Sequence, residues 1–406
     1  MLLLSSSRIF TTDPMDIAAL FQEAMEHQQA SQPEQAIVCL QKAAELQPQL
    51  AAIHYNMGVI YFDQGNFDDA AAAYQQAHER APEDPDILYN LAITFKKQGK
   101  ILDAAANYEE LLSLFPEDTD ASYNLGIIYK EMGDKEKAIT CFKKIISQDA
   151  SYLPAYNHLA HLYHKAGDID KAIPCYQQVI RLDPSHTAAR HMLASLQGKT
   201  TDTAPSEYVK EVFDHFADYD QSMQNNLNYT TPKQLRELLE RSRPEGKKFA
   251  NGLDLGCGTG LSGEAFQDVM NTFTGIDLSP VMLAKAHEKG IYSTLHEIEL
   301  TSFLEMSTEE YDFFIAADVF VYLGNLEPLF RQIKKHAAPD ACFLFSTEAT
   351  DKAFILQDTG RYGHSERYIR KLAEETGFSV KSCASANIRK EKGEWIKGNL
   401  YLLTNK

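Results

Sequence analysis

Apolar residues in the first half of the chain recur at helical spacing, and the pattern repeats every 34 residues. Segments such as HYNMGVIYFDQG and SYNLGIIYKEMG each predict one amphipathic helix that ends at a glycine. A proline follows the second helix of most repeats, where a helix must stop. We therefore expect stacked helical hairpins over residues 17–50, 51–84, 85–118, 119–152 and 153–186.

Three rows of equivalent residues carry this interpretation. Glycines end the first helices, small residues stand where paired helices approach, and a third row is aromatic: Gly65, Gly99, Gly133 and Gly167; Gly58, Ala92, Gly126 and Ala160; Tyr74, Tyr108, Phe142 and Tyr176. These rows resemble the tetratricopeptide repeat (TPR) family, which implies an α-solenoid. His27 and Ser31 depart from the pattern, as an end repeat often does. Thr187–Gln197 is in phase with a sixth first helix, so we expect an array over 17–198 with a capping helix.

The pattern changes after a small and polar linker at 199–206. Helical stretches then alternate with short β-branched and aromatic runs, which predicts a parallel sheet with helices on both faces over 207–406. Seven strands are expected: Lys248–Leu255, Thr272–Asp277, Tyr292–Ile298, Asp312–Ala317, Ala341–Thr347, Ser379–Ala386 and Leu400–Thr404.

The first predicted strand runs into the glycine-rich segment LDLGCGTG, and the second ends at Asp277. Glycines let a backbone turn tightly and touch a ligand, although a tight turn without ligand is the alternative. Leu261 stands where a dinucleotide fingerprint needs its third glycine, which disfavours NAD. Asp277 can accept hydrogen bonds from both ribose hydroxyls of a nucleoside; its alternative role is to cap the following helix.

Together these motifs resemble the class I S-adenosylmethionine (SAM)-dependent methyltransferases. The resemblance implies a Rossmann-like α/β domain with a seven-stranded sheet, and SAM as cofactor. It implies that the loop holds the methionine part of SAM, that Asp277 holds the ribose, and that the residues after it cover the adenine. The cofactor-binding candidates are Asp254, Gly256, Cys257, Gly258, Gly260, Asp277, Leu278, Met282, Glu299, Asp318 and Tyr229.

Methyl transfer needs orientation first, and a general base only for a protonated acceptor. His364, in the segment YGHSERY, is the candidate base, with a surface or capping role as the alternative; Asp318 and Tyr322 are further catalytic candidates. Residues 207–247 resemble the N-terminal lid of many methyltransferases. Within this lid we expect Tyr229 to contribute to the site and Phe213 and Phe216 to pack in the core. The Asn-Pro-Pro-aromatic motif of adenine and glutamine N-methylation is absent.

The net charge and the cysteine positions limit which binding partners, metals and cellular compartments we expect. A net charge of −18 without a basic stripe argues against nucleic acid and against an anionic membrane surface. None of the six cysteines forms a CxxC pair, so we expect no metal and a reducing, cytoplasmic compartment. The opening MLLLSSSRIF lacks the long apolar stretch of a secretory signal, although Met15 could be the true start.

Three functional hypotheses follow. A methyltransferase could recruit a protein or protein-borne acceptor through the concave surface of its repeats, which is expected to include Tyr89, Lys97 and Lys130. A small-molecule methyltransferase could use the repeats only to dock in a complex. A non-catalytic adaptor could retain a SAM-binding domain. The intact glycine loop and Asp277 disfavour the third hypothesis, because the fold alone does not need Asp277.

Overall fold

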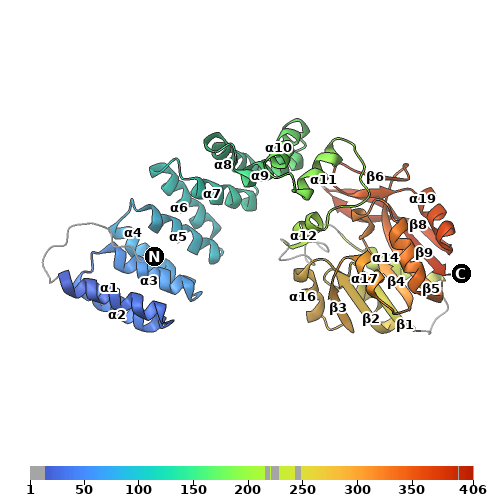
Figure 1. Cartoon of the computed structure of the whole chain (residues 1–406), viewed down its shortest axis with the longest axis horizontal. Coiled ribbons are helices and arrows are strands. Elements are labelled where there is room, and N and C mark those ends of the chain that lie inside the picture. Colours follow the sequence, from blue (N-terminus) through green and yellow to red (C-terminus); the bar gives the residue numbers. More distant parts are fainter. Residues whose placement is uncertain (1–13, 215–219, 221–227, 243–247, 392, 406) are drawn as a thin grey trace. The chain divides into compact units, whose positions relative to one another are not determined.

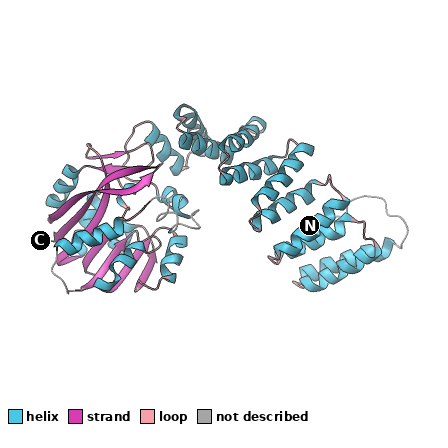
Figure 2. Cartoon of the chain, turned by 180° about the vertical axis from the view of Figure 1, so that it is seen from behind, coloured by secondary structure: helices cyan, strands magenta, loops and turns pink. Residues whose placement is uncertain are grey.

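The computed structural model describes residues 14–214, 220, 228–242, 248–391 and 393–405 (Figure 1). The chain forms two compact units, Met1–Gln178 and Val179–Lys406. The first is built from helices alone in its described part, and the second contains a sheet flanked by helices (Figure 2). Across the described ranges, no helix combines the length and apolar character needed to cross a membrane. The predicted fold class, an α-solenoid followed by a Rossmann-like domain, is confirmed.

The first unit consists of antiparallel helix pairs that each pack on the next pair. The helices are α1 (Pro14–Gln29), α2 (Pro33–Leu46), α3 (Ala51–Asp63), α4 (Phe67–Arg80), α5 (Pro85–Lys97), α6 (Ile101–Leu114), α7 (Thr119–Met132), α8 (Lys135–Gln148), α9 (Leu153–Ala166) and α10 (Ile169–Leu182). The division between the two units falls within α10.

Glycines perform the two tasks expected of them in these pairs. The four glycines that end first helices have φ between 73° and 80°, the left-handed region that other residues avoid. A Cβ on Gly58 would lie 2.7 Å from the ring of Tyr74, and one on Gly126 would lie 2.9 Å from Phe142. The small and aromatic rows therefore set how closely paired helices approach.

The second unit is centred on one mixed sheet. Its strands are β1 (Phe249–Leu255), β2 (Met270–Asp277), β3 (Thr294–Glu297), β4 (Tyr311–Ala316), β5 (Ala337–Ala349), β6 (Phe354–Leu356), β7 (Tyr362–His364), β8 (Phe378–Glu391) and β9 (Glu394–Asn405). Nine strands in the described part exceed the seven predicted. The two extra strands, β6 and β7, have three residues each, too few to show a period.

Strand order brings the predicted motifs to one edge. The order is β3-β2-β1-β4-β5 with all neighbours parallel, and β9 pairs antiparallel with both β5 and β8. Consecutive phenylalanines Phe313 and Phe314 point into the cores on opposite faces. α17 (Leu300–Met306), α18 (Glu327–His336) and α19 (Glu366–Thr376) cover one face; α14 (Thr231–Ser242) and α15 (Leu261–Phe266) cover the other. The carboxyl ends of β1, β2 and β4 thus lie side by side.

The residues before the sheet belong to this unit and are fastened to it. In α11 (Thr187–Leu196), the ring of His191 hydrogen-bonds to the carbonyl of Gly360 at 2.9 Å. In the segment expected to be a linker, the Ala204 amide donates to the Tyr322 carbonyl at 2.9 Å, and the Asp202 carbonyl accepts from Gly324 at 2.8 Å. The unit therefore begins at Val179, before the end of the repeat pattern, because α11 follows the repeat phase yet packs on the sheet domain.

A substitution at Gly398 of β9 tests how tightly β5, β8 and β9 pack. A Cβ there would clash with the Thr347 carbonyl and the Ile388 side chain. We expect Gly398→Ala to lower the free energy of unfolding by about 2 kcal/mol or more. Trp395, the single tryptophan, lies on the same strand, so its fluorescence during urea unfolding reports on this unit.

The matched control is Gly290→Ala. Gly290 has φ 64° but open space around its Cα, so only the backbone strain of about 1–2 kcal/mol applies. A loss at Gly398 no larger than the loss at Gly290 would contradict close packing of these strands.

Candidate functional site

A cavity lies at the carboxyl ends of β1, β2 and β4. In open parallel sheets this edge is where ligands bind. Eight of the predicted site residues line the cavity: Gly256, Gly258, Asp277, Leu278, Met282, Glu299, Asp318 and Tyr322. The structure therefore brings together residues that are spread over more than 60 positions of the sequence.

The glycine loop is shaped by backbone bonds to the neighbouring strand. The amides of Gly256 and Cys257 both donate to the Ile276 carbonyl at 2.9 Å. Gly256 has φ 76°, and a Cβ there would lie 2.7 Å from Val319. Gly258 has φ 53°, and no atom of the described part of the chain lies within 4 Å of where a Cβ would stand. Val319 therefore packs against the backbone of the loop at Gly256, whereas a ligand can reach the backbone at Gly258.

Asp277 joins this loop to the end of β2. Its Oδ2 accepts from the Gly258 amide at 2.8 Å, and its Oδ1 accepts from the Ser279 amide at 2.9 Å. Ser279 in turn caps α16 (Pro280–Glu288) by accepting from the Met282 amide at 3.2 Å. The carboxylate therefore braces the turn before α16 and also faces the cavity, so both interpretations of Asp277 fit its geometry.

Asp254 supports the loop from beneath and does not line the cavity. It is completely buried, and its Oδ2 accepts from the Tyr292 hydroxyl at 2.6 Å. Among the residues that the structure describes, its Oδ1 has no hydrogen-bond partner. The Tyr292 oxygen accepts from the Gly263 amide at 3.1 Å. Burial raises the pKa of Asp254 to about 7. This carboxyl fixes the loop from below, consistent with a shaping role.

Three further candidates also lie outside the cavity lining. Cys257 is buried behind the loop, and Gly260 precedes α15 with φ 90°. Tyr229 is nearly buried just before α14. Their contribution to cofactor binding stays a prediction, and any such contribution would be indirect for Cys257.

His364, the candidate base, is fully buried on β7. Its Nε2 hydrogen-bonds to the Gly324 carbonyl at 3.0 Å. Burial lowers its pKa to about 4, so the ring is neutral at pH 7 and Nε2 carries the donated proton. It does not line the cavity. Its role as a base stays a prediction, and the geometry favours a role in holding the turn that follows Tyr322.

Asp318 and Tyr322 do line the cavity, and the buried pair of Arg389 and Glu348 lies next to Asp318. Asp318 has φ 61°, a strained conformation, and its carboxylate accepts from Arg389 at 2.7 Å. Arg389 is 2% exposed and also pairs with buried Glu348. Burial raises the pKa of Tyr322, so its phenol is neutral at physiological pH. Sequence reasoning missed Arg389 and Glu348, because two charges 41 positions apart on separate strands carry no local motif.

The helix α12 (Ser206–Asp214) covers the cavity. Val209 and Phe213 line it, and the Phe213 ring meets Tyr322 edge-on at 5.6 Å. Phe213 packs against the buried cluster that includes Val321 and Tyr322, as expected, and it also lines the cavity. Phe216 lies outside the described residues. Lys210 pairs with Glu297 at 3.1 Å and anchors α12 at the end of β3.

Comparisons with known proteins match the helical repeats and the sheet-containing part of the chain separately. The profile described as methyltransferase domain matches residues 227–382, and tetratricopeptide repeat profiles match residues 29–65, 49–117, 95–162 and 154–186. The chain carries tetratricopeptide repeats and a methyltransferase domain. The family resemblance drawn from the sequence is thereby confirmed for both parts.

Relatives and solved structures resemble one part at a time. A ubiquinone biosynthesis O-methyltransferase of Pseudomonas putida (strain GB-1) is 27% identical over 151 residues, which cover 36% of this chain and 62% of the relative. A malonyl-[acyl-carrier protein] O-methyltransferase of Halalkalibacterium halodurans is 30% identical over 144 residues, covering 33% and 53%. The N-methyltransferase NodS from Bradyrhizobium japonicum WM9, solved with S-adenosyl-L-homocysteine, has 18% identity and a TM-score of 0.40, covering 48% of this chain and 97% of its own. The TPR protein YrrB has 22% identity and a TM-score of 0.39, covering 44% and 92%.

A methyltransferase domain implies SAM as the methyl donor, the cofactor expected from the glycine loop. The residues present fit this group. Asp277 presents a carboxylate to the cavity, Leu278 and Met282 add apolar surface beside it, and Gly258 leaves its backbone open to a ligand.

The raised pKa of Asp254 predicts a pH dependence of stability. From its ordinary value near ~4 up to about 7, the folded chain holds a proton that the unfolded chain has lost. Each pH unit in this window therefore costs about 1.4 kcal/mol of stability, and the loss levels off above the folded pKa. Asp254→Asn removes this titration. The unfolding free energy of the wild type minus that of Asp254→Asn should therefore fall from about pH 5 to about pH 7 and then stay constant.

Urea unfolding followed by Trp395 fluorescence measures this difference. Asp268→Asn is the control: Asp268 is bonded to Arg236, which lowers its pKa, so the corresponding difference should stay flat across the same window. A flat difference for Asp254→Asn as well would show that Asp254 ionises normally in the fold.

Proposed function

We propose that the protein is a SAM-dependent methyltransferase whose repeats recruit a protein that is, or carries, the methyl acceptor. One observation carries the proposal: a single cavity is lined by Asp277, by the approachable glycine loop and by apolar side chains of α12. The chain spans 62% of the length of a curated relative that it matches, so the activity of the whole protein is our inference.

In this proposal SAM supplies an electrophilic methyl group on a sulfonium, which is already a good leaving group. Asp277 accepts from the ribose hydroxyls, and the glycine loop receives the methionine part at Gly258. Leu278 and Met282 cover the adenine, while Glu299 accepts from its amino group. Each of these residues lines the cavity.

The acceptor would lie between the Asp318 turn and α12. Asp318 and Tyr322 border the cavity next to Phe213, and Arg389 holds the Asp318 carboxylate in place. A neutral phenol and a fixed carboxylate can orient a hydroxyl or carboxyl group by hydrogen bonds. Orientation together with exclusion of water by α12 supplies most of what this reaction needs.

We further propose oxygen as the accepting atom. The two curated relatives described above are named as O-methyltransferases, and one of them acts on a group borne by a carrier protein. The absent Asn-Pro-Pro-aromatic motif, whose place is taken by DVFVYL, agrees with this choice. The alternative is a small free acceptor, with the repeats serving only to dock the enzyme in a complex.

Binding of SAM tests the cofactor site directly. We expect calorimetric titration of the full chain to show SAM binding, and Asp277→Ala to weaken it by roughly ten- to a hundredfold, the range for losing charge-assisted hydrogen bonds. Asp277→Asn, which keeps one acceptor oxygen for the turn, should fall between them. Trp395 fluorescence checks that each variant is folded. A wild type that binds no SAM would overturn the enzyme proposal.

Substitutions on the concave surface of the repeats test whether that surface recruits the acceptor. Lys97 and Lys130, on the first helices α5 and α7, are partly or fully exposed there. We expect the double charge reversal Lys97→Glu with Lys130→Glu to cut labelled-methyl transfer to protein acceptors several-fold, while SAM binding stays unchanged. Lys143→Glu, on the second helix α8, is the matched control and should behave as wild type. Undiminished transfer in the double variant would favour the small-acceptor alternative.

A further inference from the structure

The first repeat breaks the repeat pattern at two positions one helical turn apart. The seventh position is apolar in the later repeats and the eleventh is aromatic, but the first repeat carries Glu23 and His27 there. The later residues are Met57, Leu91, Leu125 and Leu159 at the seventh position, and Tyr61, Phe95, Tyr129 and Tyr163 at the eleventh. In the first repeat, two polar side chains therefore stand where the later repeats have apolar or aromatic side chains.

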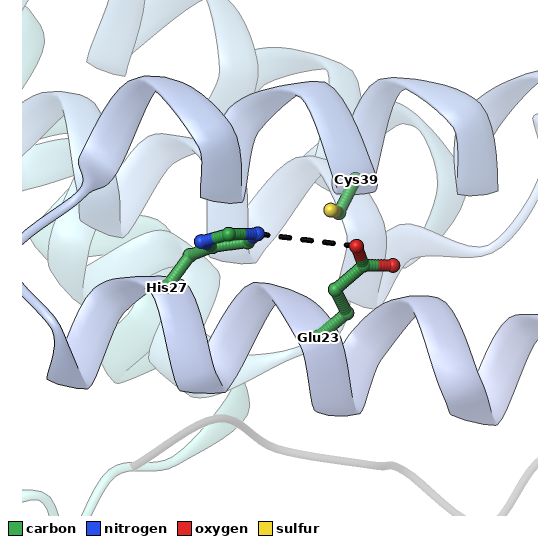
Figure 3. A group of neighbouring side chains, drawn as sticks. All are labelled: Glu23, His27 and Cys39. Carbon is green, nitrogen blue, oxygen red and sulfur yellow. Dashed lines mark ion pairs between the residues drawn. The ribbon is translucent and has the colours of Figure 1, made fainter.

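Both replacements meet a cysteine of the second helix. Glu23 and His27 project from α1 toward Cys39 of α2 (Figure 3). One ligand atom from each residue lies within 4.8 Å of the other two, and His27 Nε2 lies 3.9 Å from Glu23 Oε1. Within the described ranges, this is the one such cluster of three histidine, cysteine or carboxylate side chains.

The histidine is held in the tautomer that a metal ligand needs. His27 Nδ1 lies 2.8 Å from the amide oxygen of Gln32, which can only accept a hydrogen bond. Nδ1 therefore donates to Gln32, which leaves Nε2, on the side of Glu23, as the nitrogen available to a metal ion. A ring nitrogen fixed in this way by its opposite N–H is the usual arrangement around protein metal sites.

We propose that Glu23, His27 and Cys39 bind one divalent transition-metal ion, with Zn²⁺ the best match. Thiolate and imidazole ligands disfavour Mg²⁺ and Ca²⁺, which prefer oxygen. Tetrahedral metal–ligand bonds of about 2.0–2.3 Å place ligand atoms roughly 3.3–3.8 Å apart, so these three atoms, now within 4.8 Å of one another, would move together by up to about 1 Å on binding. A fourth position is left for water or another ligand. The exposed Glu23 carboxylate offers an entry route, while Cys39 is buried.

The ion would cross-link α1 to α2, the two helices of this repeat. A metal bound only in the folded state adds its binding free energy to folding. These three residues belong to the first unit and the cavity belongs to the second, so the proposal does not rest on the proposed activity.

Cobalt is the probe, because a Co²⁺–thiolate bond absorbs in the near ultraviolet. Full-length protein without a histidine tag is stripped with chelator, then titrated with Co²⁺ and, in parallel, with Zn²⁺ by calorimetry. We expect one equivalent to bind with thiolate absorption and the melting temperature to rise with Zn²⁺. Cys39→Ser should abolish the absorption. His27→Tyr, which restores the aromatic residue of the other repeats and should therefore fold, should weaken binding at least tenfold.

Cys141→Ser is the matched control. Cys141 occupies the same repeat position as Cys39, but its repeat has Leu125 and Tyr129 in place of the glutamate and histidine. This variant should bind Co²⁺ as the wild type does. Absence of thiolate absorption in the wild type, equal loss in Cys141→Ser, or unchanged binding in His27→Tyr would each overturn the proposal.

Discussion

The hydrogen bonds of the Asp277 carboxylate connect the two strand ends on which the site depends. One oxygen holds the glycine loop after β1 through Gly258, and the other holds the turn after β2 through Ser279. The Ile276 carbonyl, one residue earlier, accepts from two further loop amides. Because strand order makes β1 and β2 parallel neighbours, these short-range bonds suffice to shape one wall of the cavity. The same carboxylate remains at the cavity surface, where a ligand can compete for it.

The opposite wall is held by groups from much farther away. The turn at Asp318 is strained and depends on Arg389 from β8, which is itself paired with Glu348 of β5. His364 fixes the end of the same turn through Gly324, and Ala204 bonds to Tyr322 from the amino-terminal side. Buried charges of this kind are costly unless all partners are present. We infer that this wall forms only when β5, β8 and the residues before α12 are all in place.

The sequence predicted best what is local or periodic. The helix pairs, the left-handed glycines and the small residues between paired helices follow from a period that many positions repeat. The Asp277 and glycine-loop geometry follows from motifs at the ends of adjacent strands. By contrast, the short strands β6 and β7, the buried Arg389 and the cavity position of Phe213 depend on pairings between distant segments. A single sequence carries no local signal for such pairings.

The hydrogen bonds that join α11 and Asp202 to the sheet domain affect where the repeats and the methyltransferase domain could be separated by recombination. Because each repeat contacts only its neighbours, such arrays can differ in repeat number, and the end of the repeat pattern at 198 is where a crossover would be expected from the sequence. A crossover there would break the hydrogen bond between His191 and Gly360, because it would separate α11 from the domain on which it packs. A crossover before Val179 would carry this wall along intact. The modular unit of inheritance would then be the methyltransferase domain together with its last repeat helix.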